Sequence, residues 1–374
     1  MKVEWQTKKL GEVIRLEYGK PLPDEARSPS GLYAVYGANG EKTRSNRYFH
    51  DRPSVVVGRK GSAGEINLTE DQFWPLDVTY FAKFDDSQYE LKFLYYLLGT
   101  LNLPAMARGV KPGINRNDVY ALAVNVPTLS EQKRIVAILD EAFAGIATAK
   151  ANAEKNLQNA REIFENHLQS VFGQCGSGWV DTTIGEVTRF IDYRGKTPIK
   201  TESGLRLITA KNVKMGFVQR DPEEFVAPDS YDAWMTRGIP LKGDVLFTTE
   251  APCGNVAQLD TAEKVVFAQR IIIMQSDRKR LDSTFLKYAL LSSPLQKRIQ
   301  AKATGATALG IKASLLRTID ISFPKEMKEQ IRIVAKLDSL RSEISQLESL
   351  YTRKLAALNE LKQSLLQQAF SGKL

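Results

Sequence analysis

Arginine, lysine and asparagine side chains in glycine-rich turns are the residues of this sequence best suited to binding chemistry. The turn GRKGSAG (58–64) carries Arg59, Lys60 and Ser62. An arginine can donate two hydrogen bonds to the edge of a guanine, and a lysine attracts a phosphate. Any one exposed charge can also be an ordinary solvated side chain. The prediction therefore concerns such turns as a group.

Five further segments have the same character. YGANGEKTR and ARGVKPGINRND lie in the first half of the chain, and DYRGKTP, TAKNVKMG and LGIKAS lie in the second half. Asparagine can read adenine through its side-chain amide, so the asparagines count together with the cations. The contact residues predicted from these segments are Asn39, Lys42, Arg44, Arg108, Lys111, Asn115, Arg116, Arg194, Lys196, Lys211, Asn212, Lys214 and Lys312.

Signatures of catalysis are missing from the sequence. GANGEKT (37–43) resembles a phosphate-binding loop, but that motif needs four residues between its glycines and a glycine directly before the lysine. Here Gly37 and Gly40 are too close together and Glu41 precedes the lysine. The acidic runs FDDSQYE and DPEEF could serve a hydrolase or nuclease, but such runs are more typical of solvated loops. The sequence therefore predicts a chain that performs no chemistry itself.

Composition limits the class of protein. The 374 residues suit two globular units, and 43% apolar with 25% charged residues is typical of folded domains. Two histidines and two distant cysteines match no metal or disulfide spacing, which favours a reducing cytoplasm. The sequence contains no run of about 18 apolar residues, which is the length that would predict a membrane segment. The net charge of +9 favours phosphate-bearing partners, although ribosomal and membrane-surface proteins share it.

The chain contains an internal repeat. EQKRIVAILD (131–140) returns as EQIRIVAKLD (329–338), and a tryptophan followed by LGEV (10–13) returns as a tryptophan followed by IGEV (184–187). FLYYLL (93–98) likewise returns as FLKYAL (285–290). Because these landmarks keep their order, the sequence predicts a tandem duplication with insertions in the second copy.

Each copy predicts an α+β globule followed by one long helix. Runs such as PSVVVG and GDVLFT indicate strands, and a strand-like run ends at Pro127 in the first copy and at Pro324 in the second. About 44 residues without proline follow each of them. The predicted domains are residues 1–128 and 173–324 as globules, with helices over 129–172 and 325–374.

The two helices carry matching apolar stripes, with steps of four and three that are typical of a coiled coil. Only Lys362 interrupts the second stripe. The first helix leads into the second globule and the second helix starts there, so antiparallel pairing buries both stripes along a rod of about 66 Å and gives a circular, pseudo-two-fold chain. The residues predicted to pair are Ile135, Leu139, Ile146, Leu157, Leu168, Ile333, Leu337, Ile344, Leu347, Leu355 and Leu366.

These features together resemble the specificity subunit of type I restriction-modification systems. The resemblance covers the whole chain and depends on the tryptophan–LGEV openings, the GI pairs at 113–114 and 310–311, and the helices that begin with proline, EQ and LD. It is weak inside the globules. It implies two target recognition domains that each read half of a bipartite double-stranded DNA site, with the helices as a ruler between the halves.

The resemblance also implies partners. Two adenine methyltransferase subunits would dock on the repeated body, and motor-nuclease subunits would join them. S-adenosylmethionine, ATP and magnesium would then belong to the partner subunits, and this chain would bind no cofactor. A second hypothesis stays open: a coiled-coil adaptor whose globules bind proteins and not DNA.

Overall fold

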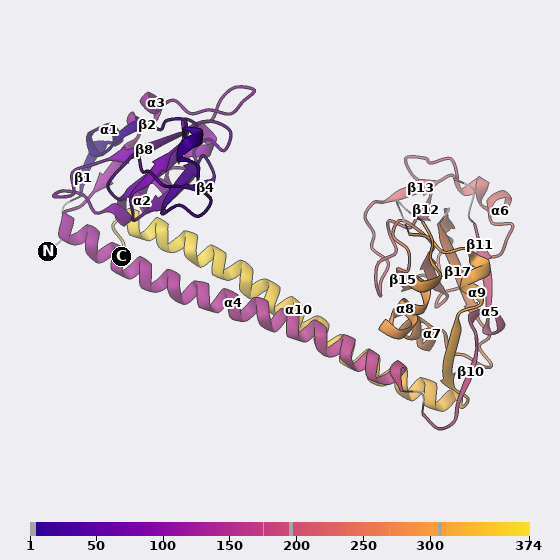
Figure 1. The fold of residues 1–374 in the computed structure, drawn as a ribbon. Coiled ribbons are helices and arrows are strands. Elements are labelled where there is room, and N and C mark those ends of the chain that lie inside the picture. Colours follow the sequence, from indigo (N-terminus) through magenta and orange to yellow (C-terminus); the bar gives the residue numbers. More distant parts are fainter. Residues whose placement is uncertain (1–4, 175, 194–196, 269, 306–308) are drawn as a thin grey trace. The chain divides into compact units, whose positions relative to one another are not determined.

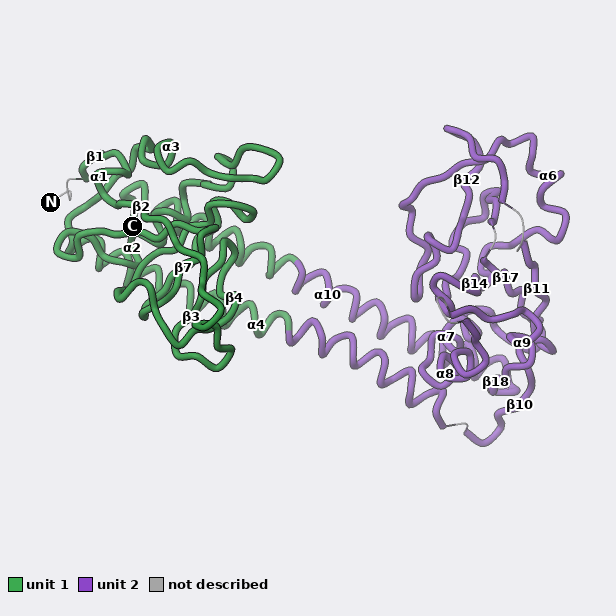
Figure 2. Tube along the Cα trace, turned by 45° about the horizontal axis from the view of Figure 1, so that its top comes forward, with its two compact units in different colours: residues 1–154, 353–374 green, residues 155–352 purple. Residues whose placement is uncertain are grey.

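A computed structural model describes residues 5–174, 176–193, 197–268, 270–305 and 309–374. The predicted contact residues Arg194 and Lys196 lie outside these residues. The chain forms two compact units (Figure 2), one of residues 1–154 with 353–374 and one of residues 155–352. Each unit contains one globule and part of both long helices. No described helix combines the length and the apolarity that crossing a membrane requires.

The globule of the first unit contains three sheets (Figure 1). The strands β1 (Gln6–Lys9) and β9 (Ala123–Val126) form an antiparallel pair. A four-stranded sheet has the order β2 (Arg15–Tyr18), β8 (Thr79–Lys83), β5 (Ser54–Gly58), β6 (Ile66–Thr69). A three-stranded sheet has the order β4 (Gly40–Ser45), β3 (Tyr33–Gly37), β7 (Phe73–Pro75). The helices are α1 (Leu10–Val13), η1 (Asp24–Ala26), α2 (Leu91–Thr100), η2 (Leu103–Met106) and α3 (Arg116–Tyr120).

The globule of the second unit repeats this topology. Its pair is β10 (Trp179–Thr183) with β18 (Asp320–Pro324). Its four-stranded sheet is β11 (Thr188–Asp192), β17 (Ile271–Ser276), β14 (Val245–Thr248), β15 (Val256–Gln258), and its three-stranded sheet is β13 (Glu224–Val226), β12 (Leu205–Ile208), β16 (Val266–Phe267). The helices are α5 (Ile184–Val187), η3 (Pro228–Ser230), α6 (Tyr231–Trp234), α7 (Ser283–Leu291), α8 (Ser293–Lys302) and α9 (Ala313–Arg317). The predicted α+β organisation in two repeats is confirmed.

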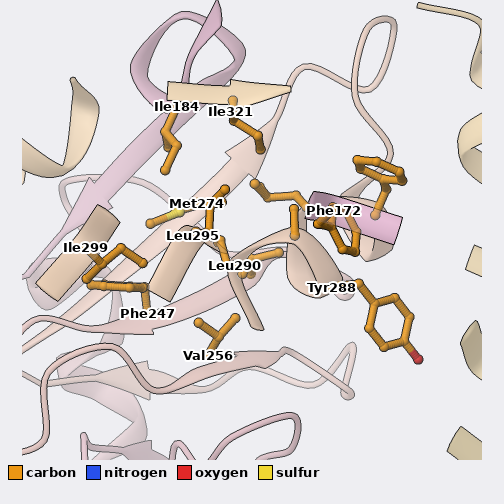
Figure 3. Close-up of a cluster of buried hydrophobic side chains, with 14 of the residues drawn as sticks. Phe172, Ile184, Phe247, Val256, Met274, Tyr288, Leu290, Leu295, Ile299 and Ile321 are labelled. Atoms are coloured by element: carbon orange, nitrogen blue, oxygen red, sulfur yellow. The ribbon is translucent and has the colours of Figure 1, made fainter. Parts of the chain in front are cut away.

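The core explains why the central strands are apolar without alternation. In β5, Val55 and Val57 pack in one apolar cluster while Val56 packs in another on the opposite face. In β14, Phe247 joins the cluster shown in Figure 3, while Leu246 joins a second cluster. A strand that is buried on both faces needs apolar residues at every position.

The glycine of each LGEV-type motif has a packing role. A Cβ atom at Gly11 of α1 would lie 2.9 Å from Cβ of Tyr120 in α3. A Cβ atom at Gly185 of α5 would lie 2.9 Å from Cβ of Arg317 in α9. Real Cβ contacts are longer, so both positions require the absence of a side chain. The motif therefore returns in the second copy because the same two short helices must pack closely.

The long helices are α4 (Leu129–Gly173) and α10 (Met327–Phe370), and they pair in an antiparallel sense within each unit (Figure 1). In the first unit, Lys150 Nζ donates to Asn359 Oδ1 at 2.7 Å. In the second unit, Arg161 Nε pairs with Glu348 Oε1 at 2.9 Å. The repeat offset of 198 relates Lys150 to position 348 and Arg161 to position 359. The two contacts therefore join equivalent positions of the repeat, with the two helices exchanged. The antiparallel coiled coil is confirmed.

Lys362, which interrupts the apolar stripe, has a partner of its own. Its Nζ lies 4.9 Å from the centre of the Phe143 ring. The repeat offset of 198 relates Phe143 to Arg341 and Phe164 to Lys362. The guanidinium of Arg341 lies 5.4 Å from the centre of the Phe164 ring. A cation above an aromatic face is attracted to it. Each unit therefore has such a cation–ring pair between its two helices. At repeat-equivalent positions, the ring of one unit corresponds to the cation of the other.

Most of the residues predicted to pair are covered along the helices. Ile135, Leu139, Ile146 and Leu168 of α4 are buried, as are Leu337 and Ile344 of α10. The partly buried members are Leu157, Ile333, Leu355 and Leu366. Leu347 is a wrong prediction, because 39% of its surface is exposed.

Candidate nucleic-acid interface

A buried glutamine fixes each globule on its long helix. The side-chain Oε1 of Gln132 accepts from the backbone of Glu90, and its Nε2 donates to the carbonyls of Gln88 and Pro127. In the second unit, Gln330 makes the same three bonds, to Asp282, Arg280 and Pro324. Both glutamines are fully buried. This clamp explains the EQ motif, whose role the sequence had not revealed.

The aspartate of each LD motif makes a second fixed contact. Tyr96 donates from its hydroxyl to Asp140 at 2.5 Å, and Tyr288 donates to Asp338 at 2.5 Å. Burial raises the pKa of both phenols well above the ordinary value, and the hydrogen bond to a carboxylate raises it further. These contacts dock α2 on α4 and α7 on α10. The globule and its helix thus form one rigid base for the loops.

Two predicted basic loops of the first unit meet in the structure. The loop after β5 and the loop at 107–116 are joined by backbone hydrogen bonds, from Gly61 to Pro112 at 2.9 Å and from Ile114 to Arg59 at 3.1 Å. Lys60 and Arg108 each bridge to Gly113. We call this joined surface the basic platform and define it by Arg59, Lys60, Ser62, Arg108, Lys111 and Arg116.

A tyrosine stands between the two innermost arginines of the basic platform. The guanidinium groups of Arg59 and Arg116 each lie 4.9 Å from the centre of the Tyr18 ring, which is 44% exposed. Each arginine also donates one hydrogen bond to the backbone, Arg59 to Asp77 at 2.8 Å and Arg116 to Leu16 at 3.3 Å. These contacts hold both arginines in place before any ligand arrives.

The outer part of the platform is open to solvent. Lys60, Arg108 and Lys111 are exposed, and Ser62 is half-buried beside them. Asn115 is exposed, but its side chain accepts from the backbone of Asn117 at 2.9 Å and so caps α3. The platform therefore combines fixed guanidinium groups with flexible cations, which is the combination that nucleic-acid surfaces use for base and phosphate contacts.

Tyr18 is the functional candidate that sequence reasoning missed. It lies on β2, far from both arginines in sequence, and only the pairing of β2 with β8 brings it beside Tyr80, 5.1 Å away between ring centres. The sequence offers one weak signal, an exposed aromatic residue at the end of a strand before a Gly-Lys pair. Its position between two arginines depends on tertiary contacts alone.

The β3–β4 hairpin carries three more predicted residues. Asn39 is exposed in its turn, and Lys42 is exposed on β4. Arg44 has a different role, because its Nε and one terminal nitrogen donate to the carbonyls of Gly31 and Leu32, each at 2.7 Å. These bonds tie β4 to the preceding loop. Two of the donors of Arg44 are therefore used within the protein itself.

The equivalent platform of the second unit has different side chains. Ile311 donates to the carbonyl of Thr249 at 2.9 Å, and Glu250 bridges to Gly310, as Ile114 and Lys60 do in the first unit. Thr249 and Glu250 thus stand where the first unit has Arg59 and Lys60. Glu250 pairs with Arg270 at 2.9 Å. At the position of Lys60, the second globule therefore presents an acidic residue that is paired with an arginine.

The predicted residues of the second unit lie on other elements. Lys211 and Lys214 belong to the connection between β12 and β13, and Lys312 precedes α9 at the position of Asn115. Asn212 is a wrong prediction. It is fully buried, its Oδ1 accepts from Thr209, and its Nδ2 donates to the carbonyl of Pro222 at 2.9 Å. This amide organises the loop and has no surface left for a ligand.

Comparison with known proteins decides the family. The model of the type I restriction modification DNA specificity domain matches residues 2–158 and again residues 176–352. The chain belongs to this family. The resemblance drawn from the sequence is confirmed, and each match covers one of the two repeats.

Relatives agree over nearly the whole length of the chain. A putative type I restriction enzyme specificity subunit of Haemophilus influenzae is 23% identical over 354 residues, which is 91% of this chain and 88% of the relative. The EcoDI specificity subunit of Escherichia coli is 22% identical over 408 residues, with 100% and 89% covered. Specificity subunits are the non-catalytic components of restriction-modification complexes, in accord with the absence of catalytic signatures in this sequence.

Solved structures share the fold of this family member. A chain from a study of complex assembly and conformational transition in the type I restriction-modification system has a TM-score of 0.77 at 22% identity, with 100% of both chains covered. The HsdS subunit of Thermoanaerobacter tengcongensis has a TM-score of 0.58 at 20% identity, with 99% of this chain and 97% of that chain covered.

Proposed function

We propose that this chain is the DNA specificity subunit of a type I restriction-modification complex and that each globule reads one half of a bipartite double-stranded site. The observation that carries this proposal is the repeated fold with dissimilar loops. The two globules share strand order, the glutamine clamp and the loop-to-loop bridges, yet Arg59 and Lys60 are replaced by Thr249 and Glu250. A repeated scaffold with different contact residues suits two different half-sites.

The basic platform supports double-stranded DNA as the ligand of the first globule. Arg59 and Arg116 are fixed by Tyr18 and by backbone carbonyls, and a guanidinium held in place loses little freedom when it binds a guanine. Lys60, Arg108 and Lys111 are exposed around them and can neutralise phosphates. The predicted roles are therefore base readout for the inner arginines and phosphate contact for the outer cations.

The proposal extends to the partners. The two repeats offer two equivalent surfaces for two identical methyltransferase subunits, because identical partners need equivalent surfaces. Motor-nuclease subunits would join this assembly. S-adenosylmethionine, ATP and magnesium would be bound by the partners and not by this chain. The paired helices would set the spacing between the half-sites, and the complex would act in the cytoplasm.

The test is to co-express this chain with the methyltransferase subunit of its system and to map adenine methylation by long-read sequencing. The control is the methyltransferase alone. A new split motif, with two short defined halves around a fixed undefined gap, is expected. A continuous motif, or methylation that does not depend on this chain, would favour the adaptor hypothesis. A variant with Lys60→Glu should weaken methylation at the split motif, since it replaces a cation of the basic platform with a negative charge.

A further inference from the structure

The turn between the first two strands of the three-stranded sheet differs between the globules. In the first unit, β3 and β4 are joined by Ala38 and Asn39 alone. In the second unit, the equivalent strands β12 and β13 are joined by residues 209–223. Both turns lie against a strand that flanks the platform loop of their unit, β5 in the first unit and β15 in the second. A Cβ atom at Gly58 would meet the carbonyl oxygen of Ala38 at 2.7 Å. In the second unit, Gly216 donates from its backbone nitrogen to the carbonyl of Val256 at 2.7 Å.

The long connection of the second unit is a rigid hairpin. Val213 and Val218 form an antiparallel bridge, and the backbone nitrogen of Lys214 donates to the carbonyl of Phe217 at 2.9 Å. Gly216 has a φ of 96°, a conformation that favours glycine in such a turn. Asn255 donates from Nδ2 to the carbonyl of Val213 at 2.8 Å, which fastens the hairpin to the platform loop.

The tip of this hairpin exposes two large apolar side chains. Met215 is 45% exposed and Phe217 is 53% exposed. Lys211 is also exposed, and Lys214 is half-buried between the apolar residues and the start of the hairpin. Apolar side chains that stay exposed to water at a rigid tip do not stabilise the fold of the second unit. The exposed Lys211 and the half-buried Lys214 on the same hairpin match a polyanion that also offers apolar surface.

We infer that Met215 and Phe217 form a wedge that inserts between stacked base pairs of the second half-site. This inference depends on the proposed function. Apolar side chains on DNA-binding proteins can enter a base step and unstack it, and base pairs are apolar on their faces while the backbone is anionic. Lys211 and Lys214 would contact the phosphates beside that step. The wedge would give the second globule an apolar contact in place of the contact that Arg59, Arg116 and Tyr18 would make in the first.

The test uses the complex of this chain with its methyltransferase subunits and duplexes that contain the mapped bipartite site. 2-Aminopurine is placed in turn at each step of the second half-site, and its fluorescence reports unstacking. The wild-type complex is expected to raise the fluorescence at one step. The variant Phe217→Ser should lose that signal and bind about tenfold more weakly, which corresponds to about 1.4 kcal/mol. Phe217→Trp should keep both properties.

The matched control is Ile199→Ser, because Ile199 is 88% exposed in the same unit and lies outside the hairpin. It should leave affinity and fluorescence unchanged. The inference is overturned if Phe217→Ser binds as tightly as the wild type, or if it loses its methyltransferase subunits, which would make the tip a protein contact. Split-site methylation by the wild type is measured separately, so a failed wedge leaves the proposed function standing.

Discussion

The buried glutamine clamp predicts a large loss of stability from one small substitution. In the variant Gln330→Ala, the backbone nitrogen of Asp282 and the carbonyls of Arg280 and Pro324 lose their partner. An unsatisfied buried polar group costs about 1–3 kcal/mol. We expect a loss of about 3 kcal/mol in the free energy of opening at this junction, because three groups are affected and each has some freedom to adjust.

Amide hydrogen exchange measures this loss directly. A drop of about 3 kcal/mol should speed exchange at the Asp282 amide by about 100-fold. The control is Gln158→Ala, because Gln158 is exposed on α4 and donates to Glu162 within its own helix. That variant should change stability by less than about 0.5 kcal/mol. The clamp would have no structural role if exchange at Asp282 were equally slow in both variants.

Three further predictions follow from packing, titration and charge. Gly11→Ala should destabilise the first unit by about 1–3 kcal/mol, because the new Cβ atom has no room. Gly145→Ala should stabilise the same unit by up to about 1 kcal/mol, because a Cβ atom there in α4 has nothing within 4 Å and alanine favours the helix. Urea unfolding measures both changes. Burial and a carboxylate raise the pKa of Tyr288, so the folded chain keeps a proton that the unfolded chain loses above about pH 10. Stability should therefore fall as the pH rises from 10, and Tyr288→Phe should make this fall shallower in urea titrations at pH 8 and 11. Arg59→Ala should weaken binding of the mapped duplex about tenfold and relax the base preference at one position of its half-site, whereas Arg27→Ala, whose side chain pairs with Asp24 in its own turn, should do neither. Equal effects of both variants would contradict the platform.

The helices and the duplication were readable from the sequence because both depend on periodicity. The stripe from Ile135 onward repeats at a fixed offset, and proline marks where each helix can begin. The order of the strands was not readable. The parallel pairing of β3 with β7, and of β12 with β16, joins short segments that are far apart in sequence and have no turn between them.

The contact loops were predictable one by one, but their grouping was not. No local pattern shows that Lys60 and Arg108 both bridge to Gly113 or that Tyr18 stands between two arginines. The sequence predicts Asn212 as a contact residue because the amide of an asparagine can read adenine. Its side chain instead satisfies the backbone of its own loop, a competing use of asparagine that is common in turns.

The central claim is that each globule reads one half-site independently. The most direct test replaces residues 173–324 with the equivalent segment of another specificity subunit and maps adenine methylation in cells that also express the methyltransferase subunit. The account predicts a split motif in which one half and the gap are kept and the other half is that of the donor. A motif in which both halves change would contradict the account.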